Sequence, residues 1–319
     1  MGHDTEKGYI PLDRSIILRF TCRGEPTTLH DDQKRQSMLI DTHAHLDYPD
    51  FADDLDKVVE DAAAAGVARI ITIGTGIESS ERAVALAEKY PNVFAVVGVH
   101  PTNVQNEVED FLPALRVLAE HPKVAAIGET GLDYHHLPSR ELESSPAIAA
   151  LQAGVAEDAE AAVLDGAYKS AQTEAFRVHL DLAVALGLNV VIHQRDAWDD
   201  TLAILEPYTG RLRGVFHCFG NRPDQAMDVI ALGHLVSFTG IITFKNAKLV
   251  RETAVTVPED CYMVETDCPY LAPVPHRGER CVPAYTRLVA EQIARDRGSS
   301  FEVVARQTTA TAEQFFRLS

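Results

Sequence analysis

Short apolar runs alternate with longer segments of helical periodicity along most of the chain. The runs are rich in β-branched residues, which favours strands. They predict eight strands, at 38–42, 69–74, 93–99, 123–128, 188–192, 214–216, 234–238 and 261–265. The segments between them place apolar residues near every third or fourth position, which indicates helices. These helices are predicted at 53–65, 79–90, 108–120, 174–186, 198–206, 222–231 and 245–254, with a last one at 283–297.

The predicted strands are apolar almost throughout, which is typical of parallel sheets covered by helices on both faces. Eight strand–helix units predict an α/β fold, a single-domain TIM-type (β/α)8 barrel over 38–319. A doubly wound open sheet is the alternative. Residues 1–37 would then be an N-terminal extension, either disordered or not translated.

Composition narrows the class of protein. The chain is 46% apolar and 24% charged, as soluble globular enzymes and binding proteins are. No apolar run approaches the ~20 residues needed to cross a membrane, and residues 1–37 lack the apolar core of a signal peptide. We therefore expect a cytoplasmic protein with no membrane contact. No feature of the sequence indicates an obligate protein partner.

Cysteine content and charge exclude further classes. The five cysteines are odd in number and lack CxxC spacing, which argues against a disulfide framework and a zinc knuckle. The net charge of −18 argues against broad neutralisation of nucleic-acid phosphates by a basic face. A polyanionic substrate would need local positive charge, such as bound cations.

Potential metal ligands follow five of the predicted strands. His43 and His45 end the first strand, and residues two apart in an extended backbone project to the same side. The carboxyl ends of barrel strands meet at one mouth, so the other donors should converge there with this pair. Any one alone is more often a hydrogen-bonded polar residue, but six in an apolar mouth would each need a separate partner. The six are His43, His45, Glu129, His193, His217 and Asp267.

Six protein donors exceed the three that a catalytic zinc ion commonly takes. They predict two divalent ions with one bridging carboxylate, an arrangement that activates water and stabilises a leaving oxygen. The reaction class is metal-assisted hydrolysis. Histidine-rich ligation suits Zn²⁺, Mn²⁺ or Fe²⁺, whereas a phosphodiester substrate and cellular supply favour Mg²⁺.

Six blocks of sequence resemble the TatD-type deoxyribonucleases, which belong to the amidohydrolase-like metal-dependent hydrolases. The blocks lie at 39–47, 98–101, 126–134, 191–197, 217–219 and 265–273. The resemblance extends from Met38 to the C-terminus, and the blocks around Glu129 and Asp267 are the most specific. It implies a TIM-type barrel and a divalent-metal-dependent hydrolase that cuts phosphodiester bonds in DNA, typically as a 3′ exonuclease. The substrate would be DNA or short oligonucleotide ends.

The resemblance also implies roles for individual residues. One ion would be held by His43, His45, Glu129 and Asp267. The second would be held by Glu129, His193 and His217. Asp267 would also act as general base toward the attacking water, so Asp267 and Glu129 are the predicted catalytic residues.

Two further residues are candidate phosphate contacts. They are Arg195 and His100, and the planar fork of an arginine matches phosphate geometry. The alternative for Arg195 is an ion pair with Asp196 or Asp133.

The chain departs from the family pattern at three places. Met38 stands immediately before the usual family opening, so residues 1–37 are an extra piece or follow an upstream start codon, and we expect their removal to spare activity. Cys281 stands where an asparagine is expected, which concerns substrate positioning. The third departure is an acidic, alanine-rich insertion at about 135–173.

The insertion follows the fourth strand and therefore starts on the active-site face. It could form a helix that narrows the mouth, or be a mobile segment with no role. With seven acids and two bases between 139 and 174, it would repel a long polyanion. We predict a preference for short or single-stranded ends.

Two other functions fit the same residues. The metal platform could act on an ester or amide, as an aminoacyl-tRNA deacylase or a cyclic amidohydrolase, because the same ions polarise carbonyl oxygens. The chain could also be a non-catalytic barrel that binds or scaffolds, although six intact ligands argue against this.

Overall fold

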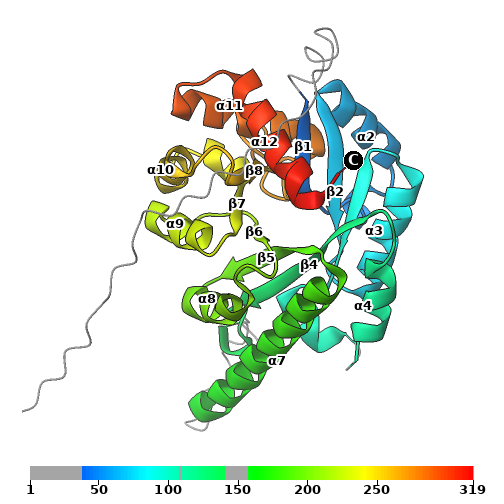
Figure 1. Cartoon of the computed structure of the whole chain (residues 1–319), viewed down its shortest axis with the longest axis vertical. Helices are drawn as coiled ribbons and strands as arrows, with labels where there is room; N and C mark the ends of the chain where they lie inside the picture. Colours follow the sequence, from blue (N-terminus) through cyan, green and yellow to red (C-terminus); the bar gives the residue numbers. More distant parts are fainter. Residues whose placement is uncertain (1–37, 108–109, 141–156, 319) are drawn as a thin grey trace, which may run out of the picture.

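The computed structural model describes residues 38–107, 110–140 and 157–318. Eight strands form one sheet, surrounded by helices (Figure 1). The strands are β1 (Leu39–Ala44), β2 (Val67–Ile73), β3 (Val93–Val97), β4 (Val124–Asp133), β5 (Asn189–Arg195), β6 (Gly214–Phe216), β7 (Leu235–Phe238) and β8 (Tyr262–Val264). The predicted extension, 1–37, lies outside the described residues.

The α-helices and 3-10 helices follow the strands in the expected alternation. The α-helices are α2 (Leu55–Ala64), α3 (Ile77–Lys89), α4 (Leu112–Ala119), α7 (Glu157–Leu186), α8 (Trp198–Leu205), α9 (Pro223–Ala231), α10 (Lys248–Thr256), α11 (Thr286–Arg297) and α12 (Phe301–Phe316). The 3-10 helices are η1 (Pro49–Phe51), η2 (Pro101–Asn106), η3 (Glu206–Tyr208), η4 (Gly240–Thr243) and η5 (Pro283–Tyr285).

The strands pair in parallel in the order β1 to β8, which confirms the predicted barrel and excludes the doubly wound sheet. The seam between β8 and β1 is bridged beyond the end of β8. Asp267 N donates to His43 O at 2.8 Å, and His45 N donates to Cys268 O at 2.8 Å. The closing hydrogen bonds thus fix two ligand-bearing segments against each other.

Three strands run further at their carboxyl ends than the sequence predicts, and β1, which reaches Ala44, includes His43. β4 continues to Asp133 and β5 to Arg195, so Glu129 and His193 lie within strands rather than after them. Every residue of β4 is buried. The long, buried β4 places Glu129 beneath the mouth of the barrel, where neighbouring strand ends surround it.

The protein has two apolar cores: one between the sheet and the surrounding helices, and a second inside the barrel. Inward side chains such as Ile71, Val96 and Met263 pack with Phe315 and Phe316 from α12. Asn189 at the start of β5 donates to Phe315 O at 2.6 Å, which fixes α12 at the amino ends of the strands. Helix α12 lies across this end of the barrel (Figure 1). The sequence prediction did not include α12.

Truncating Phe315 to alanine should lower the free energy of unfolding by about 3–5 kcal/mol, because its ring is 1% exposed and seals the inner core. Denaturant unfolding measures this. Val117→Ala is the control, since Val117 is 73% exposed and its truncation should change stability little. A loss below about 1 kcal/mol for Phe315→Ala would contradict the claim that this ring seals the inner core.

The predicted insertion is helical in its described C-terminal part. Helix α7 begins at Glu157, well before the predicted start at 174, and its N-terminal half projects past the barrel in Figure 1. Ser139 anchors this half, because its Oγ donates to Asp165 Oδ2 at 2.6 Å. Residues 141–156 lie outside the described residues.

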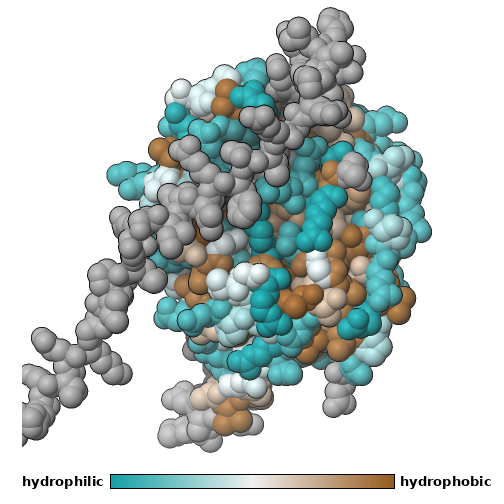
Figure 2. All heavy atoms as spheres, viewed as in Figure 1, coloured by the Kyte–Doolittle hydropathy of each residue, from teal (hydrophilic) through white to brown (hydrophobic). Residues whose placement is uncertain are grey.

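Hydrophobic and hydrophilic residues are interspersed on the face of the molecule drawn in Figure 2. Across the described ranges, none of the helices combines the length and the apolar character that a membrane span requires.

Candidate metal centre

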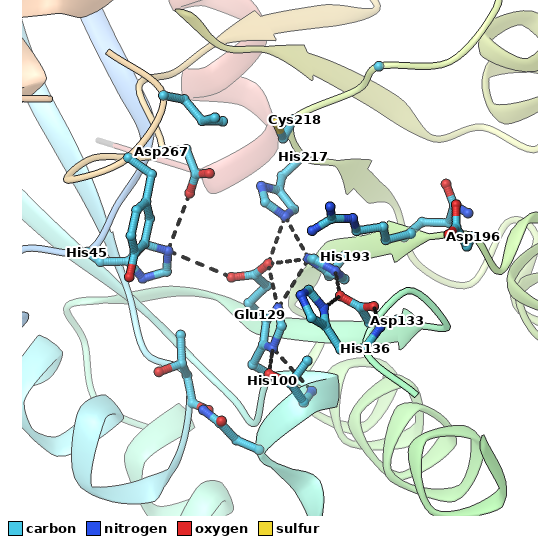
Figure 3. A pocket seen from close by; sticks show the side chains of 18 of the residues that line it. His45, His100, Glu129, Asp133, His136, His193, Asp196, His217, Cys218 and Asp267 are labelled. Carbon is cyan, nitrogen blue, oxygen red and sulfur yellow. Dashed lines mark hydrogen bonds and ion pairs between the residues drawn. The ribbon is translucent and has the colours of Figure 1, made fainter. Parts of the chain in front are cut away.

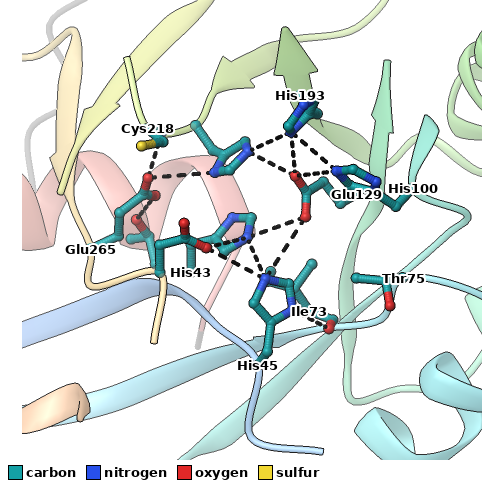
Figure 4. Close-up of polar contacts among 12 residues, drawn as sticks. His43, His45, Ile73, Thr75, His100, Glu129, His193, Cys218 and Glu265 are labelled. Atoms are coloured by element: carbon teal, nitrogen blue, oxygen red, sulfur yellow. Dashed lines mark hydrogen bonds and ion pairs between the residues drawn. The ribbon is translucent and has the colours of Figure 1, made fainter. Parts of the chain in front are cut away.

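The six predicted metal ligands converge at the carboxyl end of the barrel (Figure 4). They come from β1, β4 and β5 and from the segments directly after β1, β6 and β8. Between 0 and 15% of each side chain is exposed. The structure therefore brings together all six residues that the sequence predicts from their places at strand ends.

Glu129 divides its two carboxylate oxygens between two groups of imidazoles. Its Oε2 lies 3.4 Å from His43 Nε2 and 3.9 Å from His45 Nε2. Its Oε1 lies 2.9 Å from His193 Nδ1 and 2.7 Å from His217 Nε2. A carboxylate placed in this way can bridge two cation positions.

Asp267 completes the group on the side of β1. Its Oδ1 lies 3.4 Å from His45 Nε2 and 3.6 Å from His43 Nε2. Its backbone has a positive φ of 61°, a conformation that non-glycine residues rarely adopt. Such conformations are concentrated at functional sites, where the surrounding structure holds them.

Two of the imidazoles are oriented by partners outside the centre. His45 Nδ1 lies 3.2 Å from the carbonyl oxygen of Ile73, and His193 Nε2 lies 3.0 Å from Asp133 Oδ2. Because a carbonyl and an ionised carboxylate only accept, we assign the ring proton to these two nitrogens. The other nitrogen of each ring then directs its lone pair into the centre, as metal-bound histidines do.

The donor set fits divalent cations. His43 Nε2 and His45 Nε2 are 3.3 Å apart, and His193 Nδ1 and His217 Nε2 are 3.1 Å apart. Lone pairs this close repel unless a proton or a cation lies between them. Three sets of ligand atoms each lie within 4.8 Å of one another, one of them formed by His43, His45 and Glu129.

Electrostatics keeps the carboxylates of the centre ionised. Burial alone raises the pKa of Glu129, but the surrounding imidazoles, His217 foremost, lower it well below its usual value. Burial likewise raises the pKa of Asp267, and its bond to His45 brings the net shift below the usual value. Both groups are negatively charged at neutral pH, as cation binding requires.

Asp133 is a buried partner that the sequence prediction mentioned only as a possible partner of Arg195. Its Oδ2 accepts from His193 Nε2 at 3.0 Å and from His136 Nδ1 at 2.9 Å. Its Oδ1 accepts from the backbone N–H groups of His135 and His136, at 2.9 and 3.0 Å. Its position four residues after Glu129 on one strand was the available signal, because an even spacing returns to the same side.

Glu265 is a second buried carboxylate that the sequence prediction missed. It is 1% exposed, and its Oε1 accepts from the backbone N–H of Cys218 at 2.6 Å. The same oxygen lies 3.8 Å from His217 Nδ1, on the side of that ring away from Glu129. A charge within an apolar strand was the signal that could have identified it.

We expect Asp133→Asn to weaken metal binding about 10- to 100-fold, because His193 loses the charged partner that orients it. Titration of metal-stripped protein measures the affinity. Asp196→Asn is the matched control: Asp196 is an exposed carboxylate that pairs with His135 and Arg140, so its change should leave the affinity unaltered. Wild-type affinity in Asp133→Asn would contradict this role.

His100 lies closer to the centre than a phosphate contact alone requires. Its Nε2 is 3.2 Å from His193 Nδ1 and 3.5 Å from Glu129 Oε1, and these three residues form one of the candidate donor sets. Its Nδ1 accepts from the backbone N–H of Thr102 at 3.2 Å. Burial lowers the pKa of His100 to about 3, so the ring is neutral.

Arg195 stands apart from the six donors. It ends β5 on the wall of the pocket and is exposed. In the described ranges its guanidinium has no ion pair within 4.0 Å, so the alternative pairing with Asp196 or Asp133 is wrong. Asp196 pairs instead with Arg140, at 3.1 Å.

A pocket of about 1230 Å³ opens above the centre (Figure 3). Amide and hydroxyl side chains line much of it, with three tyrosines: Tyr48, Tyr168 and Tyr270. Tyr168 belongs to the predicted insertion, so that segment contributes to the pocket wall. Cys281, which stands where the family has an asparagine, is fully buried and is not among the pocket-lining residues of the described ranges.

The nearly closed parallel barrel and the histidine–carboxylate cluster at its mouth define a metal-dependent hydrolase of the TIM-barrel class. The family profile described as "TatD related DNase" matches residues 40–317. The chain therefore belongs to the TatD family.

Individual relatives cover nearly the whole described barrel. The uncharacterized metal-dependent hydrolase YabD of Bacillus subtilis is 37% identical over 283 residues, 88% of this chain and 100% of the relative. The protein named 3′-5′ ssDNA/RNA exonuclease TatD of Enterobacter lignolyticus is 32% identical over 284 residues, 87% of this chain and 98% of the relative. The crystal structure of YJJV, a TatD homolog from Escherichia coli, has a TM-score of 0.75 at 26% identity, covering 89% of this chain and 100% of that one.

Proposed function

We propose that this hydrolase cleaves phosphodiester bonds in DNA with two divalent ions, as a 3′ exonuclease. The observation that carries the proposal is the division of the Glu129 oxygens between two groups of imidazoles, 2.7–2.9 Å on one side and 3.4–3.9 Å on the other. Two-metal centres of this kind serve displacements at phosphorus. The relative named as an exonuclease for single-stranded DNA and RNA supports a nucleic-acid substrate.

In this proposal each ion has its own protein ligands. One would be held by His43, His45, Glu129 and Asp267. The other would be held by Glu129, His193 and His217. When bound, the ions would lower the pKa of a water molecule and stabilise developing charge on the leaving oxygen. Mg²⁺, Mn²⁺ and Zn²⁺ are the candidates.

The protein groups supply proton transfer and positioning. Asp267 is ionised and accepts the proton of the attacking water, a role that requires a carboxylate beside the centre. Asp133 and the Ile73 carbonyl hold His193 and His45 in the tautomers that leave a lone pair facing the centre. The neutral His100 ring, next to Glu129 and His193, is placed to contact the scissile phosphate. A cytoplasmic location remains a prediction of the sequence.

Product analysis tests the proposal. Single-stranded DNA labelled at its 5′ end, incubated with Mg²⁺ or Mn²⁺, should shorten stepwise and release mononucleotides, and chelation should stop the reaction. Release of the amino acid from aminoacyl-tRNA with no nucleotide product would favour the ester or amide alternative instead. Absence of any chelator-sensitive activity would indicate the non-catalytic barrel.

A further inference from the structure

The ends of β4 and β5 form one wall of the pocket beside the metal centre. Asp133 and Arg195 are register partners in these strands, and the Tyr134 N–H donates to Arg195 O at 2.8 Å. His136 follows immediately after β4, so its ring and the Arg195 side chain both line the pocket from this wall. In Figure 3 the His136 ring lies next to His100 and Asp133.

The Arg195 guanidinium is available to an anion. Both carboxylates near it are already bound by other groups. Asp133 accepts four hydrogen bonds, two of them from the His193 and His136 rings. Asp196 Oδ2 accepts from Arg140 at 3.1 Å and lies 3.2 Å from His135 Nδ1. A free arginine fork beside a metal centre binds the paired oxygens of a phosphate.

His136 is oriented toward the same ligand. Its Nδ1 bonds to Asp133 at 2.9 Å, and in the described part of the chain its Nε2 has no hydrogen-bond partner. The side chain is 42% exposed on the pocket side. With Nδ1 bonded to Asp133, Nε2 is the ring atom left to contact a phosphate group in the pocket.

The loops after β1 and β8 carry aromatic rings into the pocket instead. Tyr48 stacks on the ring of His45 with centroids 4.7 Å apart, and Tyr270 meets Tyr48 edge to face at 6.2 Å. Tyr270 is 55% exposed, although it lines the pocket. Exposed aromatic rings of this kind stack on nucleobases. The metal centre thus lies between aromatic rings from the loops after β1 and β8 and, on the other wall, the Arg195 and His136 side chains at the ends of β5 and β4.

We infer that Arg195 and His136 bind a second phosphate group, one nucleotide away from the phosphate being cleaved. This rests on the proposed phosphodiesterase function. The substrate class is a short single-stranded oligonucleotide with at least two phosphates. Among the pocket-lining residues in the described ranges, Arg195 is the sole arginine or lysine, so the pocket does not neutralise a long run of phosphates.

Three dinucleotides test the subsite. The first has only the internal phosphate, the second adds a 5′-phosphate, and the third adds a 3′-phosphate. We expect one added phosphate to raise kcat/KM by about 10- to 100-fold, the size of a charge-assisted contact. Whichever added phosphate raises kcat/KM, the 5′ or the 3′ one, shows on which side of the scissile phosphate the subsite lies.

Variants test whether Arg195 and His136 cause this rise in kcat/KM. Arg195→Met should reduce the gain toward onefold, Arg195→Lys should retain part of it because it keeps the charge without the fork, and His136→Leu should reduce it partially. Arg116→Met is the matched control, since Arg116 is an exposed arginine on α4 away from the pocket, and it should retain the full gain.

The results that would overturn only the second-phosphate subsite differ from those that would also overturn the proposed function. Equal cleavage of all three dinucleotides, or an unchanged gain in Arg195→Met, would overturn the second-phosphate subsite and leave the phosphodiesterase function standing. Failure to cleave any dinucleotide or longer oligonucleotide with metal present would overturn both.

Discussion

Replacing Glu129 with alanine should lower kcat/KM for a single-stranded oligonucleotide by about three orders of magnitude or more. Its two oxygens face both groups of imidazoles, at 2.7 Å from His217 and 3.4 Å from His43, so the change weakens both ion positions together. An ion contributes several kcal/mol to the transition state, and each 1.36 kcal/mol is a factor of ten in rate. Steady-state cleavage and metal content of the same preparation measure the effect.

Glu88→Ala is the matched control for this change. Glu88 is a 62% exposed carboxylate that pairs with His121 on the surface, so activity and metal content should match wild type. A Glu129→Ala variant that retained wild-type activity, or that bound its full complement of metal, would exclude Glu129 as a bridging ligand.

Asp267→Asn should lower kcat about 10²- to 10⁴-fold, the contribution of a positioned general base. Asparagine has nearly the same shape, but it removes the charge that lies 3.4 Å from His45 Nε2 and cannot accept the proton of the attacking water. In the proposed ligand set the ion position at His193 and His217 takes no ligand from Asp267, so that position should keep its metal. Substrate KM should change less than kcat.

The Asp267 prediction is checked by kinetics with metal counting. Asp224→Asn, at an exposed residue paired with Arg222, should leave kcat, KM and metal content unchanged. Wild-type kcat in Asp267→Asn would show that another group takes the proton. Loss of both ions would show that Asp267 supports the whole centre rather than one position.

Much of the fold followed from the sequence because the chemistry of parallel strands is repetitive. Strands buried on both faces are apolar, and the first polar donors at their carboxyl ends are therefore conspicuous. His43, Glu129 and Asp267 could be identified as partners across more than 200 positions without knowing any contact. In the barrel the Glu129 and Asp267 carboxylates lie 3.4 and 3.6 Å from His43 Nε2.

The missed features depend on contacts that periodicity does not encode. Helix α12 follows the eighth unit and seals the barrel with Phe315, a role set by the open amino end rather than by the strand–helix pattern. The sequence offers Asp133 only as an alternative ion-pair partner of Arg195, yet in the structure donors from His193, His136 and the backbone occupy it fully. The choice among nearby donors is decided by strand register, which a single sequence does not specify.

The central claim is a two-ion centre that cleaves phosphodiester bonds, and one titration tests it most directly. Metal-stripped wild-type protein is titrated with Mn²⁺ while bound metal and DNA cleavage are followed in the same samples. We predict no cleavage without metal, two ions bound per chain at saturation, and activity that rises with occupancy of the second position. Full cleavage by the metal-free chain, or saturating activity with one ion per chain, would contradict the account.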